Sequence, residues 1–384
     1  MVSMKESSKN EQLRVQGVSR RDFLKFAGFG GLAAFGAALA GCSNAGIAAK
    51  GSAAGSAATG SAESSASKTV TVTDMGGTEV EVPAKITKYA DGWFAHNEIS
   101  IMLTGAEGMV ATACDPKAYP WMYKVAPNMK DATLSFGDDF NFEELAALEP
   151  QVIFDSKDAL RDKAEEVGIP VVNCMFKTFD EMKKSIELTA SVFGGKAPKI
   201  AKKYNDELTK TIEEIEKKTK DIDDLDRPKV MHGNSVYTLT IDGTGTIIDD
   251  WIKVAGGQNA VTENTTGNAQ AKFSMEQVLA WNPDIITGKV GEAEQIMNDP
   301  NWAEVKAVQD KKVYVNPKGV FGWDRYGVEE LLQVQWAASV ISPDLFGDLK
   351  MESKVKDFYK NYLNYELTDE DVKLILAAKP PVEK

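Results

Sequence analysis

FNFEELAALEPQVIF, residues 140–154, and FSMEQVLAWNPDIIT, residues 273–287, are two copies of one sequence pattern. Five of the fifteen aligned positions are identical, namely Phe, Glu, Ala, Pro and Ile. In each copy a polar or aromatic start leads into a short helix, a proline ends that helix, and an apolar strand follows. Two generic units could agree this far by chance, but the copies lie in separate parts of the chain with the same rhythm. The repeat therefore predicts two lobes of similar build.

Short apolar runs alternate with helical patterns around the first copy. These runs are MVATA at 109–113, QVIF at 151–154 and PVVNC at 170–174. Strands separated by helices in this way favour a mainly parallel sheet that is covered on both faces, so the predicted fold class is α/β. Ahead of them, VTVTDMGGTEVEV at 70–82 alternates apolar and polar residues around Gly76 and Gly77, which predicts a β-hairpin.

A long helical pattern fills residues 194–222, which contain no proline after Pro198. At 1.5 Å per residue, such a helix spans ~35 to 40 Å. A single stiff crossing between two lobes favours small rocking over large hinge closure. We therefore expect an N-terminal α/β lobe at 68–194, a connecting helix at 195–226, and a C-terminal α/β lobe with terminal helices at 227–384.

The segment SRRDFLKFAGFGGLAAFGAALAGC at 19–42 indicates export. Arg20 and Arg21 precede a short, glycine-loosened apolar run, which is typical of a twin-arginine signal. A transmembrane anchor is the alternative, but the run is shorter and less apolar than a spanning helix requires. The run ends in LAGC, which resembles a lipobox in which Cys42 becomes lipidated.

This interpretation makes residues 1–41 a signal peptide that is removed on export. Residues 42–67 are rich in Ala, Gly and Ser and predict a flexible linker. We expect a lipid-anchored protein on the periplasmic face or on the cell surface, with its lobes held clear of the membrane.

The net charge, the cysteines and the histidines each limit what the protein can bind. The formal net charge of -13 disfavours a nucleic-acid partner. Cys114 and Cys174 each follow an apolar run that reads as the end of a parallel strand, so they could be neighbours in one sheet, and two buried thiols are favoured over a disulfide. The chain has two histidines and no CxxC or HxxxH spacing, which predicts no structural metal and no cofactor.

Several segments, taken in order and spacing, resemble the class III substrate-binding lipoproteins of ABC importers, which capture ferric siderophores, haem, cobalamin and related chelates. The likeness covers residues 68 to about 346. The resemblance rests on TDMGGTEVEVPAKITKYA at 73–90, the two FxxExxxAxxPxxI units, the long helix, IIDDWIKVAGGQNA at 247–260 and KKVYVNPKG at 311–319. The resemblance implies two Rossmann-like lobes joined by one rigid helix, with an ABC permease and its ATPase as partners. We expect the receptor to be a monomer.

The resemblance also implies a docking role for one glutamate on each lobe, because family members insert such residues into arginine pockets of the permease. The motif places Glu143 and Glu276 at these positions. Each also stands at the start of a predicted helix, where a carboxylate complements the helix dipole. Helix stabilisation alone is the alternative interpretation.

Ligands of open α/β lobes bind outside the carboxyl ends of the strands, so the loops after strands are expected to contact the ligand. Three such loops carry aromatic, histidine or arginine side chains. The candidate ligand-binding residues are Trp93, Phe94 and His96 after ITKYA, His232 and Tyr237 around MHGNSVYTL, and Trp323, Arg325 and Tyr326 after KVYVNPKG. An arginine beside an aromatic wall suits a bulky anionic chelate.

Packing roles remain open for several of these residues. Trp323 could lie in the core while Arg325 pairs with Glu329 one turn later. His96 could be a hydrogen-bonded residue instead of a metal ligand. AYPWMY at 118–123 could form a second aromatic rim or an ordinary packed loop.

The sequence therefore predicts a binding protein that captures an iron or other metal chelate, with a siderophore as the first candidate. Haem, cobalamin and an oxyanion such as molybdate are the alternatives, and two histidines are too few for a bare transition-metal ion. An exported enzyme that handles a cofactor is a second class, but the chain lacks GxSxG, CxxCH, GxGxxG and an iron–sulfur cysteine run. A structural lipoprotein would explain the anchor and not the aromatic and arginine loops.

Overall fold

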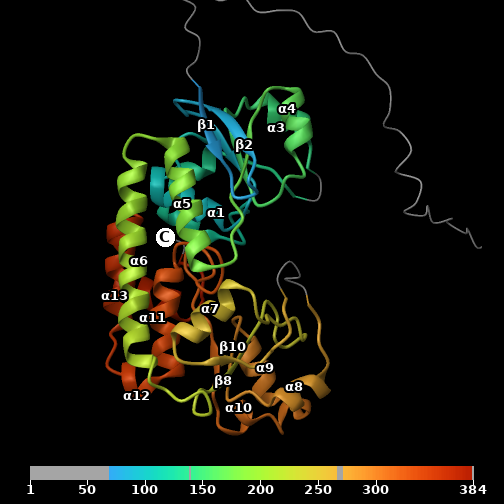
Figure 1. The fold of residues 1–384 in the computed structure, drawn as a ribbon, viewed down its shortest axis with the longest axis vertical. Coiled ribbons are helices and arrows are strands. Elements are labelled where there is room, and N and C mark those ends of the chain that lie inside the picture. Colours follow the sequence, from blue (N-terminus) through green and yellow to red (C-terminus); the bar gives the residue numbers. More distant parts are fainter. Residues whose placement is uncertain (1–68, 138–139, 266–270, 383–384) are drawn as a thin grey trace, which may run out of the picture. The chain divides into compact units, whose positions relative to one another are not determined.

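The computed structural model of the chain describes residues 69–137, 140–265 and 271–382 (Figure 1). The export segment up to Cys42 and the linker after it lie outside the described residues, so their roles stay predictions. Within the described part of the chain, no helix has the length and apolar character needed to cross a membrane.

The predicted hairpin is confirmed. Strands β1, Thr69–Thr73, and β2, Glu79–Pro83, pair antiparallel. In the turn between them, the buried Asp74 carboxylate accepts a hydrogen bond from the amide of Thr78 at 2.9 Å. Gly77 adopts a φ of 85°, which glycine tolerates without steric cost.

The first sheet is parallel throughout and has the strand order β5-β4-β3-β6-β7. Its strands are β3 Tyr89–Asp91, β4 Met109–Thr112, β5 Thr133–Leu134, β6 Ile153–Asp155 and β7 Val171–Asn173. The helical segments between and after them are α1 His96–Thr104, α2 Pro120–Val125, η1 Pro127–Asp131, α3 Phe142–Ala147, α4 Arg161–Glu166 and α5 Phe179–Phe193.

The second sheet is also parallel and has the order β11-β10-β8-β9. Its strands are β8 Lys229–His232, β9 Gln258–Asn259, β10 Ile285–Gly288 and β11 Val313–Val315. Its helical segments are α7 Ile247–Val254, α8 Met275–Trp281, α9 Glu292–Asn298, η2 Pro300–Trp302 and α10 Lys306–Gln309. The series β9-β8-β10-β11 repeats the series β4-β3-β6-β7 of the first sheet, so the predicted likeness of the two lobes is confirmed.

The repeated sequence unit also has one local structure in both lobes. The side chains of Asn141 and Ser274 cap α3 and α8 by accepting hydrogen bonds from the first helical turn. After each helix a single residue with positive φ, Glu149 at 54° and Asn282 at 44°, turns the chain just before the proline. The strands β6 and β10 then enter equivalent places in the two sheets.

Helix α6, Ala197–Thr219, is the predicted connection, and its 23 residues span about 35 Å. It is shorter than the predicted 195–226 because the aspartate-rich residues 221–226 favour turns over helix. It packs against α1 and α5 on one side of the connection and against α7 and α11 on the other, which Figure 1 shows along its length.

The chain ends in helices α11 Glu330–Ile341, α12 Pro343–Phe346, α13 Met351–Tyr362 and α14 Asp369–Leu376. The largest core cluster joins Ile99 and Leu103 of α1 to Trp251 of α7 and to Leu331 and Leu332 of α11. Because α11 is buried along most of its length, it links the apolar interiors of both lobes.

The last helix and the residues after it also contact the first lobe. Lys124 pairs with Asp371 at 2.7 Å, and the Trp121 indole donates to the carbonyl of Lys379 at 2.9 Å. The C-terminal segment, which the sequence assigned to the C-terminal lobe, therefore contacts both lobes.

The two described cysteines are free and buried, as predicted. Cys114 follows β4 and Cys174 follows β7, and strands β3 and β6 lie between these two in the sheet. The expectation that the cysteines could be neighbours is therefore wrong, because the strand order separates them.

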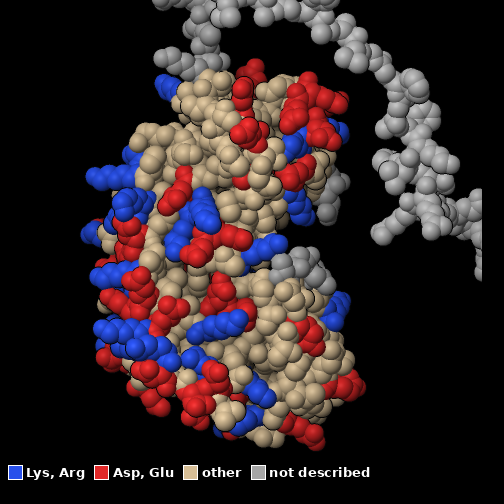
Figure 2. Space-filling view, viewed as in Figure 1, with Lys and Arg blue, Asp and Glu red and all other residues tan. Residues whose placement is uncertain are grey.

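Acidic and basic side chains are interspersed over the face drawn in Figure 2. This mixture offers no broad basic surface on that face.

Candidate ligand-binding site

A cavity of about 240 Å³ lies where the strands of the second sheet end. Its walls come from the ends of β8 and β10, from the loops after β8, β10 and β11, and from Tyr119 of the first lobe. Further lining residues are Phe321, Gly322, Asp324, Arg325 and Ala378. This is the edge of a parallel α/β sheet at which ligands are expected. The cavity therefore defines the candidate site.

Arg325 lines this cavity, as the sequence predicted, but its charge is compensated. Its guanidinium pairs with Asp242 at 2.9 Å and with Asp324 at 2.7 Å, and it lies 3.2 Å from Nε2 of His232. Burial alone would lower the pKa of Arg325, but the two carboxylates raise it. The predicted alternative partner, Glu329, is not among its ion pairs.

His232 also lines the cavity and is almost fully buried. Its Nδ1 lies 2.7 Å from the hydroxyl of Thr287 on β10, and its Nε2 lies 2.9 Å from the Asp324 carboxylate. Burial would raise the pKa of Asp324, but Arg325 and His232 lower it strongly. His232, Asp324, Arg325 and Asp242 thus form one self-contained polar network in the cavity wall.

Lys289 and Lys318 supply the remaining positive charge of the cavity. Lys318 donates to the carbonyl of Ala118 at 3.2 Å, and its ammonium lies 5.2 Å from the ring centre of Tyr119. Burial and the nearby Lys289 lower the pKa of Lys318. Among the described residues, neither lysine forms an ion pair. The sequence reasoning missed both lysines, although each follows the end of a predicted strand.

Aromatic rings continue the cavity wall into the first lobe. Phe94, which is 43% exposed, stacks on Tyr119 with ring centres 6.0 Å apart. Tyr119 in turn stacks on Phe321 at 5.6 Å. The aromatic rim predicted at 118–123 is therefore present at Tyr119, whereas Trp121 and Tyr123 are buried.

Trp323 departs from its expected ligand role because its side chain has no exposed surface. Its indole donates to Glu329 at 3.0 Å, and the same carboxylate accepts from the hydroxyl of Tyr359 at 2.7 Å and from the amide of Phe321 at 2.9 Å. This places Trp323 in the support of the 319–329 loop, as the core-packing alternative predicts.

Tyr326 contacts the first lobe. Its backbone has a φ of 63°, a conformation that costs a bulky residue on the order of 1 to 3 kcal/mol. Its ring lies 5.9 Å from that of Trp93 and 5.7 Å from that of Phe176. Trp93 and Tyr326, two of the predicted ligand residues, are therefore brought together as an aromatic contact between the lobes.

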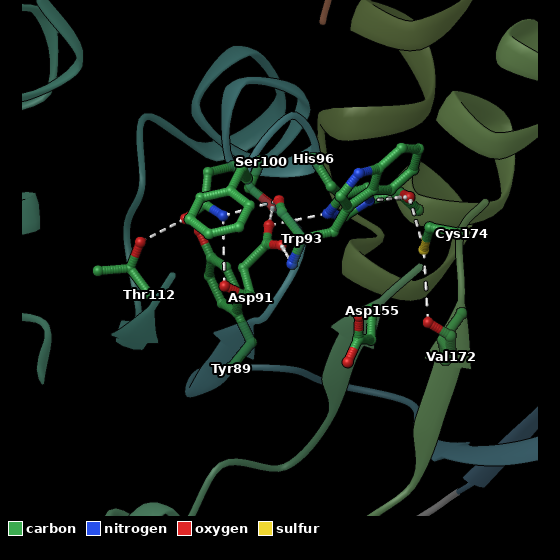
Figure 3. Close-up of polar contacts among 12 residues, drawn as sticks. Tyr89, Asp91, Trp93, His96, Ser100, Thr112, Asp155, Val172 and Cys174 are labelled. Atoms are coloured by element: carbon green, nitrogen blue, oxygen red, sulfur yellow. Dashed lines mark hydrogen bonds and ion pairs between the residues drawn. The ribbon is translucent and has the colours of Figure 1, made fainter. Parts of the chain in front are cut away.

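His96 lies in the buried network of Figure 3 and has no exposed surface, which departs from the expected ligand role. Its Nδ1 lies 2.8 Å from the carboxylate of Asp91, the last residue of β3, and its Nε2 lies 2.8 Å from the Thr189 hydroxyl. Ser100 donates to the same Asp91 oxygen at 2.7 Å. Burial would lower the pKa of His96, but Asp91 and Cys174 raise it to about 10.

Tyr237, like Trp323 and Tyr326, is a predicted ligand residue of the second lobe that does not line this cavity. Its hydroxyl donates to Asp299 at 3.1 Å, and its ring packs against the smaller core cluster of the second lobe. The loop after β8 therefore contributes His232 to the cavity and not Tyr237.

Glu143 and Glu276 are exposed, and each lies in the first turn of its helix, α3 or α8. Hydrogen bonds from the helix backbone and from Ser274 lower the pKa of Glu276. Both positions are thus open to a partner.

Within the described part of the chain, no group of three His, Cys, Asp or Glu side chains is arranged to hold a metal ion.

A family model described as periplasmic binding protein matches residues 97–319, more than half of the chain. The chain belongs to this family. Its members are solute-binding proteins that work outside the cytoplasm, and the resemblance to substrate-binding proteins of ABC importers is thereby confirmed.

Individual relatives agree with this assignment. The molybdate-binding protein MolA of Haemophilus influenzae is 28% identical over 274 residues, which are 62% of this chain and 74% of MolA. The structure of MolA bound to molybdate has a TM-score of 0.70 at 22% identity and covers 78% of this chain and 99% of MolA. A periplasmic solute binding protein of Veillonella parvula has a TM-score of 0.68 at 27% identity, covering 80% and 97% of the two chains. An uncharacterized lipoprotein of Methanocaldococcus jannaschii is 25% identical over 235 residues, which are 56% of this chain and 59% of the relative.

Proposed function

We propose that this protein captures a small anion in the cavity of the second lobe and delivers it to an ABC permease. The observation that carries the proposal is the pair Lys289 and Lys318, whose charges have no ion-pair partner among the described residues of an acidic chain. Two uncompensated ammonium groups at the carboxyl edge of a parallel sheet favour a negatively charged ligand.

The size of the cavity favours a compact ligand. Sites for drug-sized molecules occupy about 300 to 1,000 Å³, whereas this cavity has about 240 Å³. A siderophore, haem or cobalamin is drug-sized or larger, so the oxyanion alternative fits the cavity better. The molybdate-binding relative supports the same choice.

The proposal includes export by the twin-arginine route and a lipid anchor at Cys42. The sequence motif carries this part, and the relative named as a lipoprotein supports it. The proposal contains no catalytic step, which the family of binding proteins supports. It also includes no resident cofactor and no partner copy of the chain, as expected from the sequence.

Binding of an oxyanion by the full-length protein tests the proposal. We expect titration calorimetry to detect molybdate with micromolar or tighter affinity. The Lys289→Met, Lys318→Met double variant removes both free ammonium groups, so its affinity is expected to fall at least about 100-fold.

Lys312→Met is the matched control, because Lys312 is exposed and immediately precedes β11, at the end of the strand opposite the cavity. This variant should bind as the unaltered protein does. Binding of ferric siderophore, haem or cobalamin together with silence toward oxyanions would overturn the proposed ligand class.

Docking through Glu143 and Glu276 is the second part of the proposal. Reversing both charges, Glu143→Lys with Glu276→Lys, places like charges against the arginine pockets expected on the permease. Stimulation of the cognate importer's ATPase in proteoliposomes should fall about 10-fold or more, while molybdate binding stays unchanged. Glu144→Lys, an exposed neighbour in the same helical turn, is the control and should have little effect. Equal losses in the control and the double variant would count against specific docking.

A further inference from the structure

We propose that Lys289 and Lys318 act as a pair that selects doubly charged tetrahedral oxyanions over singly charged ones of the same size. This inference rests on the proposed function and names the substrate class of the same cavity.

The two lysines come from neighbouring loops. Lys289 follows β10 and Lys318 follows β11, and these strands pair in parallel up to Gly288 opposite Val315. The two ammonium groups interact electrostatically, since Lys289 contributes to the lowered pKa of Lys318. Because both side chains line one cavity, their like charges repel each other, and an anion bound between them relieves that repulsion.

None of the other charged groups of the cavity forms an ion pair with either lysine in the described part of the chain, although Asp324 and Glu329 counter part of the lowering of the Lys318 pKa from a distance. Arg325 pairs with both Asp324 and Asp242, so it offers no free positive charge to a ligand. The nearby carboxylate of Glu292 is held by the hydroxyl of Ser235 at 2.7 Å and by backbone amides of the loops after β8 and β10. Neither group pairs with a lysine ammonium.

Lys318 has only neutral partners, the Ala118 carbonyl and the Tyr119 ring. Such contacts are weaker than a charge-assisted hydrogen bond to an oxyanion. Lys318 is half-buried and Lys289 is exposed at the cavity mouth. A doubly charged ligand can pair with both ammonium groups, whereas a singly charged ligand can pair with only one of them.

The cavity also limits the number of ligand atoms. A cavity needs about 10 to 15 Å³ to admit one water molecule, so a cavity of about 240 Å³ admits an anion with four oxygens. The side chain of Asn234, which lines the cavity, makes no hydrogen bond within the described structure and provides a neutral donor. A tetrahedral oxyanion therefore fits with room for bridging water.

Tungstate and perrhenate test the inference, because they are tetrahedral oxyanions of nearly equal size that carry double and single charge. We expect the full-length protein to bind tungstate at least about 10-fold more tightly than perrhenate in titration calorimetry. In Lys318→Met the affinity for tungstate should fall about 10- to 100-fold, whereas that for perrhenate should change little. Lys318→Arg keeps the charge and should preserve the preference, and Lys312→Met should leave both affinities unchanged.

Three outcomes separate the possibilities. A tungstate preference that disappears in Lys318→Met, with an unaltered urea-unfolding midpoint, supports the inference. Equal affinities for tungstate and perrhenate would overturn selection by charge and leave anion capture standing. Silence toward tungstate, molybdate, sulfate and perrhenate alike would overturn both the inference and the proposed function.

Discussion

Asp91→Ala is expected to lower the free energy of unfolding by about 3 to 5 kcal/mol, because it leaves the buried His96 without its counter-ion. Asp91 and His96 have no exposed surface, and Nδ1 of His96 lies 2.8 Å from Oδ2 of Asp91. The Ser100 hydroxyl loses its acceptor in the same variant. Asp91→Asn retains an acceptor at this position and should cost less, about 1 to 2 kcal/mol.

The measurement is urea unfolding of the full-length protein followed by tryptophan fluorescence. Asp348→Ala, at an exposed position, is the matched control and should change stability by less than about 0.5 kcal/mol. A loss in Asp91→Ala as small as that of the control would show that the ion pair contributes nothing to stability.

The same pair sets a pH dependence. The pKa of His96 is raised to about 10, whereas an unfolded histidine titrates near about 6.5. The ion pair's contribution is therefore fully present below about pH 6.5 and is lost as the pH rises through about 10. The stability gap between the unaltered protein and Asp91→Ala should narrow over that interval. A gap that is constant with pH would contradict a charged His96.

The repeated unit was predictable from sequence because its determinants are local. Asn141 and Ser274 are cap residues, and a proline ends each helix four residues or fewer before a strand. The hairpin around Gly77 is equally local. Such features depend on neighbours in the chain, so a single sequence contains them.

The site was harder to predict, because its geometry depends on partners that are distant in sequence. Arg325 was identified, but its neutralisation by Asp242 requires two segments 83 positions apart to meet. Trp323 and His96 have residue types that suit ligands, yet Glu329 and Asp91 hold them in the interior. The sequence prediction also selected aromatic, histidine and arginine residues as ligands and left out the lysines after the strands that line the cavity.

Two carboxyl groups are buried together at the contact between α1 and the start of α11, and the sequence did not predict this. Glu98 and Glu329 are both fully buried, and they interact with each other. Glu329 accepts three hydrogen bonds, from Trp323, Tyr359 and Phe321, and these favour its ionised form. Burial nevertheless raises the pKa of Glu329 to about 7.

Glu98 has the opposite environment. Its carboxyl group faces the amides of Val328 and Glu329 without forming a hydrogen bond of good geometry, and the nearby Glu330 also raises its pKa. Burial and the charge of Glu329 raise the pKa of Glu98 well above its usual range. Tyr204 from α6 also lies in this region, where its hydroxyl donates to the Val328 carbonyl at 2.8 Å. The environment therefore favours the protonated form more strongly at Glu98 than at Glu329, which has three hydrogen-bond donors.

Glu329→Leu is expected to cost about 3 to 5 kcal/mol, because three buried donors lose their acceptor. Glu98→Gln, which copies the protonated side chain, should fold as well as the unaltered protein. In the unfolded chain Glu98 releases its proton above about pH 4.3, while the folded chain retains it. The stability of the unaltered protein should therefore fall by about 1.4 kcal/mol per pH unit above that point, relative to Glu98→Gln. Urea unfolding at several pH values measures this difference, and parallel pH profiles for the two proteins would show that Glu98 is ionised in the fold.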